Sequence, residues 1–204
     1  MTKFIYVMDP MCSWCWAFRP AIHQLQENFP DIPIQYLMGG LAPDTDELMS
    51  TEMQNMIQGI WRQIENQTGT AFNHSFWEQC QPRRSTYPAC RAVISSEALQ
   101  PGSSVMMIDA IQRAYYEDAS NPSDDELLIK LAIQCGLNPD QFKDALNSSE
   151  TESTLREQIR TGQRMGAQGF PSLFLQQGEK TDPIAFGYTS SETVLKRVES
   201  YLGS

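Results

Sequence analysis

The stretch Phe4–Cys15 reads FIYVMDPMCSWC and joins a hydrophobic strand pattern directly to a Cys-x-x-Cys pair. The apolar run at residues 3–8 predicts a buried strand. Apolar residues then recur at helical spacing as far as Phe29, so a helix is expected to begin at the cysteines. Cys12 and Cys15 are therefore predicted to lie close together at the start of the helix that follows this strand.

This placement points to thiol–disulfide chemistry. Two thiols three positions apart at a helix start can close a small disulfide. The first of them, Cys12, faces unpaired backbone N–H groups and the positive end of the helix dipole. Both influences favour a thiolate, so the pKa of Cys12 is predicted to be lowered and that of Cys15 is not.

Two other roles for the cysteine pair are less favoured. A zinc site commonly takes four Cys or His ligands in two closely spaced pairs. Here there is one such pair, and the other Cys and His residues are scattered: Cys80, Cys90, Cys135, His23 and His74. A structural disulfide is less favoured still, because the chain starts without an export signal and reducing compartments do not sustain such bonds.

Composition and charge narrow the class of protein. With 204 residues, 41% of them hydrophobic, the chain can bury a sizeable core as one domain or as one domain with an insertion. A net charge of -10 argues against a nucleic-acid partner, which needs clustered Lys and Arg, and disfavours acidic partners.

The amino terminus and the hydropathy pattern predict the cellular location. Residues 1–8 include neither a basic segment nor the long apolar segment of a signal peptide. No apolar run approaches the roughly 18 to 20 residues of a membrane span. We therefore expect a cytoplasmic protein with no membrane partner.

The first 40 residues predict a β-α-β unit, followed by a long helical segment. Residues 34–38 read as a second strand closed by Gly39-Gly40. About 120 residues, from 41 to 164, contain helical patterns and no convincing strand. Capping boxes at Asp44–Glu47 and Ser123–Glu126 are predicted to start two of these helices.

Strand patterns return near the carboxyl terminus. Residues 172–176 and 184–186 are predicted strands, joined through the hairpin connection Gln177–Lys180. A final helix is expected from about Ser191. The predicted order is β-α-β, a helical block, and then β-β-α.

This order resembles the DsbA-type branch of the thioredoxin superfamily. The resemblance rests on the Cys-x-x-Cys at the first helix and on Gly169–Ser172, which reads GFPS before the third strand. FrnE-like members of that branch share the Asp-Pro-x-Cys-x-x-Cys start. The resemblance implies an α/β, thioredoxin-like fold with a large all-helical insertion. The thioredoxin-like domain would comprise residues 1–40 and 165–204, and the inserted helical domain residues 41–164.

The resemblance also implies roles for individual residues. Cys12 would be the exposed nucleophile, Cys15 the buried resolving thiol, and Pro171 a cis-proline facing both, although a trans proline that begins the strand is the alternative. The backbone of Phe170 would face the disulfide and pair with an extended substrate. Trp14 lies between the cysteines and is expected to contact substrate, because Cys12 must be accessible to attack.

The favoured function is that of a thiol–disulfide oxidoreductase acting on protein or peptide thiols and disulfides. Glutathione is a candidate small substrate, and neither a metal nor a cofactor beyond the redox-active disulfide is expected. Ser13-Trp14 differs from the Pro-Trp common in FrnE-like members, and this dipeptide tunes the reduction potential, so the direction of exchange stays open.

Two alternative functions are kept beside the favoured one, and two further cysteines, Cys135 and Cys90, have structural or functional roles to be predicted. One alternative is a glutathione-dependent transferase or isomerase of the kappa-class type, which would use Cys12 to activate the thiol of glutathione. Kappa-class proteins have serine at that position, so Cys12 speaks against this activity. The other is a non-catalytic redox-sensing or chaperone-like binding protein. Cys135 lies on an apolar stripe and is expected to pack. Cys90, at the start of a predicted helix, is either a core thiol or one that faces the active site.

Overall fold

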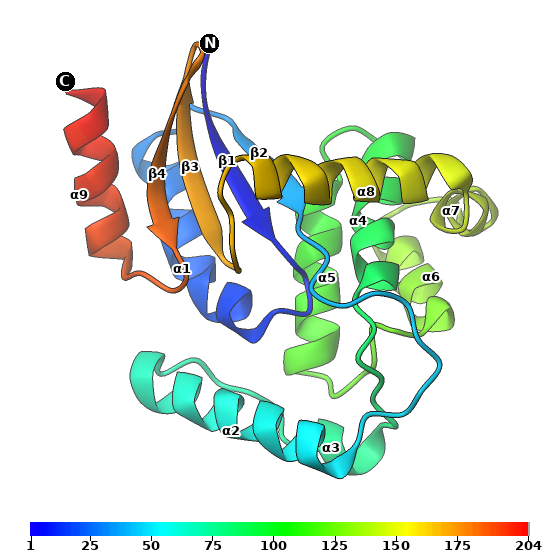
Figure 1. Ribbon diagram of the computed structural model, residues 1–204. Helices are drawn as coiled ribbons and strands as arrows, with labels where there is room; N and C mark the ends of the chain where they lie inside the picture. The colour runs from blue at the N-terminus through cyan, green and yellow to red at the C-terminus, as the bar shows by residue number, and fades with distance from the viewer. Residues whose placement is uncertain (204) are drawn as a thin grey trace.

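A four-stranded mixed sheet organises one half of the molecule in the computed structural model, which describes residues 1–203 (Figure 1). The strands are β1 (Thr2–Met8), β2 (Ile34–Met38), β3 (Ser172–Gln177) and β4 (Lys180–Phe186), in the spatial order β2-β1-β3-β4. β1 pairs parallel with β2 and antiparallel with β3, and β4 is antiparallel to β3. The central position of β1 explains its nearly continuous apolar sequence, because both of its faces are covered.

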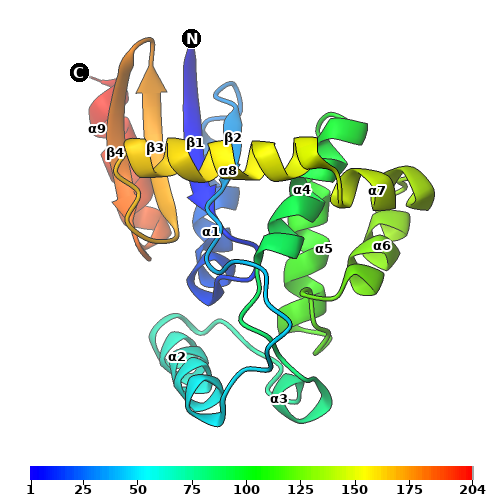
Figure 2. The same ribbon diagram turned by 45° about the vertical axis from the view of Figure 1, so that its right-hand side comes forward.

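Helices cover both faces of this sheet. α1 (Ser13–Asn28) and α9 (Ser191–Leu202) pack together on one face, where the ring of Phe18 lies 5.9 Å from that of Tyr6. α8 (Ser149–Arg164) crosses the other face, as Figures 1 and 2 show, and meets Val7 there. A Cβ at Gly162 would lie 2.9 Å from Val7 Cγ1, so a glycine allows α8 to approach the sheet closely.

The predicted helical block is present between β2 and β3. Before α8 it contains α2 (Thr51–Thr68), α3 (Phe76–Gln79), α4 (Tyr87–Leu99), α5 (Ser104–Tyr116), α6 (Asp125–Gln134) and α7 (Pro139–Leu146). Within the described part of this block, β pairing is limited to one isolated bridge between Leu48 and Arg83. Figure 2 shows α4 to α7 beside the β2 edge and α2 below the start of α1. No helix within residues 1–203 is long and apolar enough to cross a membrane.

Neither predicted capping box forms. α2 begins at Thr51, where Ser50 Oγ accepts from Met53 N at 3.3 Å, whereas Asp44 pairs with Arg91 at 2.7 Å. The Asp44–Glu47 prediction was therefore wrong, because an ion pair with a distant helix satisfies Asp44 better than an exposed helix start would.

The second capping box fails for a similar reason. α6 begins at Asp125 with Asp124 as its N-cap residue, and no side chain caps it. Ser123 Oγ instead donates to the carbonyl oxygen of Ser85 at 2.6 Å. A long-range partner again replaces the local one.

The carboxyl-terminal hairpin is tighter than predicted. Gln177 pairs with Lys180, so the connection consists of Gly178 and Glu179 alone, and β4 runs through Pro183. Proline has no N–H for the ladder, and the sequence pattern therefore placed the strand after it. β4 is an edge strand, and an edge position tolerates that missing donor.

Candidate active site

The Cys-x-x-Cys pair occupies the start of α1. Cys12 is the N-cap residue, in an extended conformation, and its carbonyl oxygen accepts from Cys15 N at 2.9 Å and from Trp16 N at 3.1 Å. Both thiols are free, with Cys12 7% exposed and Cys15 fully buried. The expectation of an exposed Cys12 was therefore wrong in its literal sense, because the residue is buried and lines the wall of a pocket.

The two thiols differ in acidity. A hydrogen bond with the Cys15 thiol is the main influence lowering the pKa of Cys12, and the backbone N–H groups of Cys15 and Trp14 lower it further against the effect of burial. Burial raises the pKa of Cys15 well above its ordinary value, and its interactions with Cys12 raise it further. Cys12 is thus the thiol that ionises first, as the sequence predicted.

The loop before β3 lies against Cys12. The Phe170–Pro171 peptide bond is cis, as the resemblance implies, and Cys12 Sγ lies 3.8 Å from the carbonyl oxygen of Phe170. A Cβ at Gly39 would lie 2.0 Å from Phe170 Cε1. Gly39, directly after β2, therefore leaves space for the Phe170 ring. The sequence alone had indicated only that Gly39 closes the strand.

Asp9, directly after β1, joins three separate segments at this site. Its carboxylate accepts from Met11 N at 2.8 Å, Leu41 N at 2.7 Å and Thr86 Oγ1 at 2.6 Å. It is fully buried, and burial raises its pKa even though these hydrogen bonds oppose the shift. The only sequence signal for this residue is the Asp-Pro that precedes the cysteines.

Cys90 lies beneath the site without reaching it. The residue is fully buried, and its thiol donates to Asp9 Oδ2 at 3.4 Å. Burial, followed by the nearby Asp9 charge, raises the pKa of Cys90 well above its ordinary value. Of its two predicted roles, that of a core thiol is therefore confirmed.

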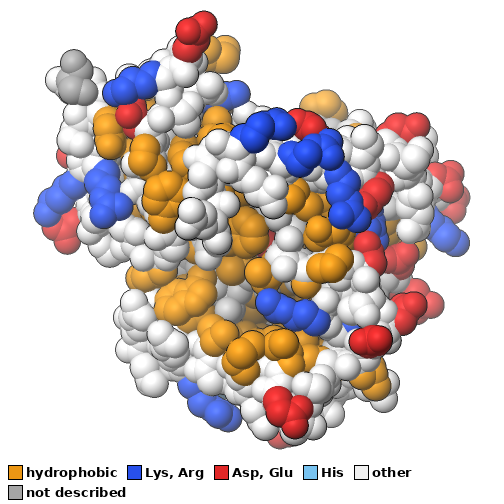
Figure 3. Space-filling model, in the orientation of Figure 1, with side chains coloured by type: hydrophobic (Ala, Val, Ile, Leu, Met, Phe, Trp, Pro, Cys, Tyr) orange, Lys and Arg blue, Asp and Glu red, His pale blue; other side chains and the backbone are white. Residues whose placement is uncertain are grey.

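A pocket of about 450 Å³ opens beside Cys12, between the sheet half and the helical block. Cys12, Ser13 and Trp14 line one side, Phe170 and the end of α8 line another, and residues of α2 including Met56 and Trp61 lie opposite. Figure 3 shows hydrophobic side chains gathered around a hollow on this face. Trp14 and Phe170 therefore both line the pocket that contains Cys12, and their contact with substrate stays a prediction.

The remaining Cys and His residues lie elsewhere. Cys80 donates to the carbonyl oxygen of Ala119, Cys135 ends α6, His74 pairs with Glu65 and His23 is exposed. Within residues 1–203, no three His, Cys, Asp or Glu side chains gather in a way that could hold a metal ion.

A Cys-x-x-Cys pair at a helix start, facing a cis-proline loop on a four-stranded sheet, defines a thioredoxin-type thiol protein. The chain belongs to the DSBA-like thioredoxin domain family, whose model matches residues 5–199. Its fold is the thioredoxin-like fold with the helical insertion characteristic of DsbA-like proteins.

Known proteins share this architecture. A putative protein disulfide isomerase from Nitrosomonas europaea is 27% identical, with a TM-score of 0.89 over 99% of this chain and 98% of that one. The cytosolic disulfide reductase DsbM from Pseudomonas aeruginosa, solved with GSH, is 20% identical, with a TM-score of 0.79 over 99% of this chain and 100% of that one.

A curated relative matches by sequence. The ClpXP adapter protein SpxH of Halalkalibacterium halodurans is 23% identical over 81% of this chain and 56% of its own length. The chain spans less than two thirds of the length of the curated relatives it matches.

The difference in acidity predicts selective alkylation. With its lowered pKa, Cys12 should react with iodoacetamide at a pH below that needed by an ordinary thiol. Cys15, Cys80, Cys90 and Cys135 should lag, because burial raises each of their pKa values. Peptide mapping by mass spectrometry across a pH series measures this, with the Cys12→Ser variant as control. Labelling of Cys15 before Cys12 would contradict the assignment.

Proposed function

We propose that this protein is a thiol–disulfide oxidoreductase in which Cys12 attacks and Cys15 resolves. The observation that carries the proposal is the placement of the Cys-x-x-Cys pair at the start of α1, with Cys12 against the cis-proline loop and in the lining of a pocket. The low pKa of Cys12 supplies a thiolate, which is the attacking species in disulfide exchange. Membership of the DSBA-like family supports the same conclusion.

In the reducing direction the Cys12 and Cys15 thiols give two electrons to a substrate disulfide. The Cys12 thiolate attacks one sulfur of a substrate disulfide, forms a mixed disulfide and releases the first substrate thiolate, which takes up a proton. Cys15 then loses its proton and attacks Cys12 Sγ, releasing the second substrate thiol and leaving a Cys12–Cys15 disulfide. Two molecules of an external thiol of the glutathione type then reduce the Cys12–Cys15 disulfide to the two thiols and leave as their own disulfide. The oxidising direction reverses these steps.

The substrate-binding part of the proposal assigns the pocket walls to two domains. Residues 1–40 and 165–204, of which residue 204 lies outside the described residues, form the thioredoxin-like domain that carries the redox pair. Residues 41–164 form the helical domain that closes the pocket. Phe170 supplies backbone groups to an extended substrate and Trp14 supplies contact area. Pro171 holds the Phe170 carbonyl against Cys12. Protein or peptide thiols and glutathione are the proposed partners.

We assign the reaction to the cytoplasm. The description of the structurally similar DsbM as a cytosolic disulfide reductase supports this location. The direction of exchange depends on the reduction potential of the pair rather than on the motif.

The test is an equilibration in glutathione buffers of graded redox ratio, followed by acid quenching, alkylation and mass analysis of the Cys12–Cys15 peptide. We expect one two-electron transition, together with accelerated reduction or oxidation of insulin. If no Cys12–Cys15 disulfide forms at any ratio, the proposal fails. A reversible disulfide without turnover would identify a redox-sensing binding protein instead.

A further inference from the structure

The pocket beside Cys12 differs in charge from the chain as a whole. The chain carries a net charge of -10. Among the described residues that line the pocket, Arg84 is the only charged side chain apart from the thiolate form of Cys12. No Asp or Glu belongs to that lining, so a cation lines a pocket from which carboxylates are absent. The expectation that acidic partners are disfavoured, which came from the net charge, therefore does not apply to this pocket.

The guanidinium of Arg84 has no protein partner. Within residues 1–203 it makes neither an ion pair nor a hydrogen bond, whereas its neighbour Arg83 pairs with Asp124. The other cations without such partners are Arg62, Lys130 and Lys143, all of which are exposed to solvent. Arg84 is half-buried and lines the pocket beside Tyr115, whose pKa its charge lowers against the effect of burial. A half-buried guanidinium without an anion is a site at which a ligand can supply one.

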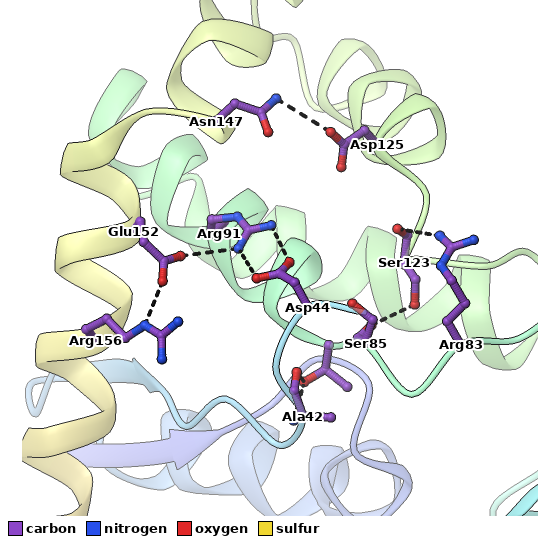
Figure 4. Close-up of polar contacts among 11 residues, drawn as sticks. Ala42, Asp44, Arg83, Ser85, Arg91, Ser123, Asp125, Asn147, Glu152 and Arg156 are labelled. Carbon is purple, nitrogen blue, oxygen red and sulfur yellow. Dashed lines mark hydrogen bonds and ion pairs between the residues drawn. The ribbon is translucent and has the colours of Figure 1, made fainter. Parts of the chain in front are cut away.

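The backbone on both sides of Arg84 is fixed. Arg83 donates to the carbonyl oxygen of Ser123 at 2.9 Å, and the carbonyl oxygen of Ser85 accepts from Ser123 Oγ at 2.6 Å, as Figure 4 shows. Two residues further on, Thr86 donates to Asp9, the residue that organises the loop before Cys12. The backbone at Arg84 is therefore held relative to the cysteine pair, which helps to place its side chain for a specific subsite.

The pocket has the size and chemistry for a small peptide-like ligand. Its volume of about 450 Å³ lies within the range typical of small-molecule sites. Gln163 and Gln168 add amide groups to the lining, and α2 adds an apolar wall. These groups suit a ligand with a carboxylate, amide bonds and a sulfur that reaches Cys12.

We propose that Arg84 forms an anion subsite of the active site, which binds a carboxylate of a small acidic thiol or disulfide while its sulfur meets Cys12. The proposal rests on the thiol–disulfide exchange above and names its substrate class. Arg84 binds the substrate and takes no part in bond exchange.

The test compares disulfides of different charge. Glutathione disulfide carries carboxylates, bis(2-hydroxyethyl) disulfide is neutral and cystamine is cationic. For Arg84→Gln we expect the ratio of kcat/KM for glutathione disulfide to that for the neutral disulfide to fall roughly ten- to hundredfold, mainly through KM, since this is the usual strength of a charge-assisted hydrogen bond. Arg84→Lys should keep part of the preference for glutathione disulfide over the neutral disulfide. Arg84→Glu should raise kcat/KM for cystamine relative to the other two disulfides.

The matched control is Arg62→Gln, which removes the same charge from an exposed position on α2 outside the pocket lining. It should leave the ratio unchanged. The preference of the wild-type protein for glutathione disulfide should weaken with added salt, because ions screen the contact. If Arg84→Gln slowed all three disulfides equally, or left the ratio unchanged, the anion subsite would be refuted.

A binding measurement separates this proposal from the proposed function. In a Cys12→Ser, Cys15→Ser background no exchange takes place, and calorimetry can follow reduced glutathione with and without Arg84→Gln. Weaker binding on loss of Arg84 supports the subsite even if the wild-type protein turns over no disulfide. If reduced glutathione binds equally well with and without Arg84→Gln, the subsite is overturned even if exchange is fast.

Discussion

Replacing Cys12 with serine is expected to lower the rate of disulfide exchange by on the order of a thousandfold or more, because a serine hydroxyl can neither attack a disulfide nor form a mixed disulfide. Insulin reduction and glutathione-disulfide turnover both measure this loss. The matched control is Cys135→Ser, which removes a thiol at the end of α6. It should retain the wild-type rate.

Replacing Cys15 should have a different result. In Cys15→Ser the first attack still occurs and the resolving step is lost, so a mixed disulfide between Cys12 and substrate should accumulate. Intact mass spectrometry under non-reducing conditions would detect it as an added substrate mass on Cys12. If Cys15→Ser instead kept full turnover and conjugated electrophiles to glutathione, the protein would be a glutathione-dependent transferase. If Cys12→Ser kept normal exchange, the nucleophile would be wrongly assigned.

Removing the Asp9 carboxylate is expected to destabilise the fold by about 3 kcal/mol. In Asp9→Ala the backbone N–H groups of Met11 and Leu41 and the hydroxyl of Thr86 lose their acceptor, and buried donors without partners are costly. Urea unfolding measures the change. Asp46→Ala, at an exposed position, should stay within about 0.5 kcal/mol of the wild type.

The same carboxylate predicts a pH dependence. Burial raises the pKa of Asp9 in the folded protein above its value in the unfolded chain. The folded state therefore binds the proton more tightly. The part of the stability that depends on protonation of Asp9 is fully present below the unfolded pKa and is lost as the pH rises through the folded pKa, whereas the hydrogen bonds that Asp9 accepts remain. In Asp9→Asn this contribution should vanish, so the stability of the wild-type protein relative to the variant should fall with rising pH. A constant difference across the pH series would contradict the raised pKa.

Local sequence patterns were sufficient to predict most helices and strands and the position of the Cys12–Cys15 pair. β1, β2 and the start of α1 follow directly from hydrophobic periodicity. The placement of Cys12 and Cys15 is a property of one continuous segment, and so is the lowered pKa of Cys12, which depends on groups no more than three residues away. The resemblance to DsbA-type proteins added the loop at Pro171, which no spacing rule connects to the cysteines.

By itself the sequence thus determined where the thiol pair, the strands and most helices lie, since these features depend on neighbours in the chain. Only the tertiary structure decided what surrounds the thiols. Thr86 reaches Asp9 from 77 positions away, and Phe170 reaches Cys12 from 158. Arg84 is one cation among 15 Lys and Arg residues in the sequence. Its place in the pocket that Cys12 also lines arises because the helical block packs beside the sheet half. Contacts of this kind depend on packing between distant segments, which leaves no periodic trace in either segment alone.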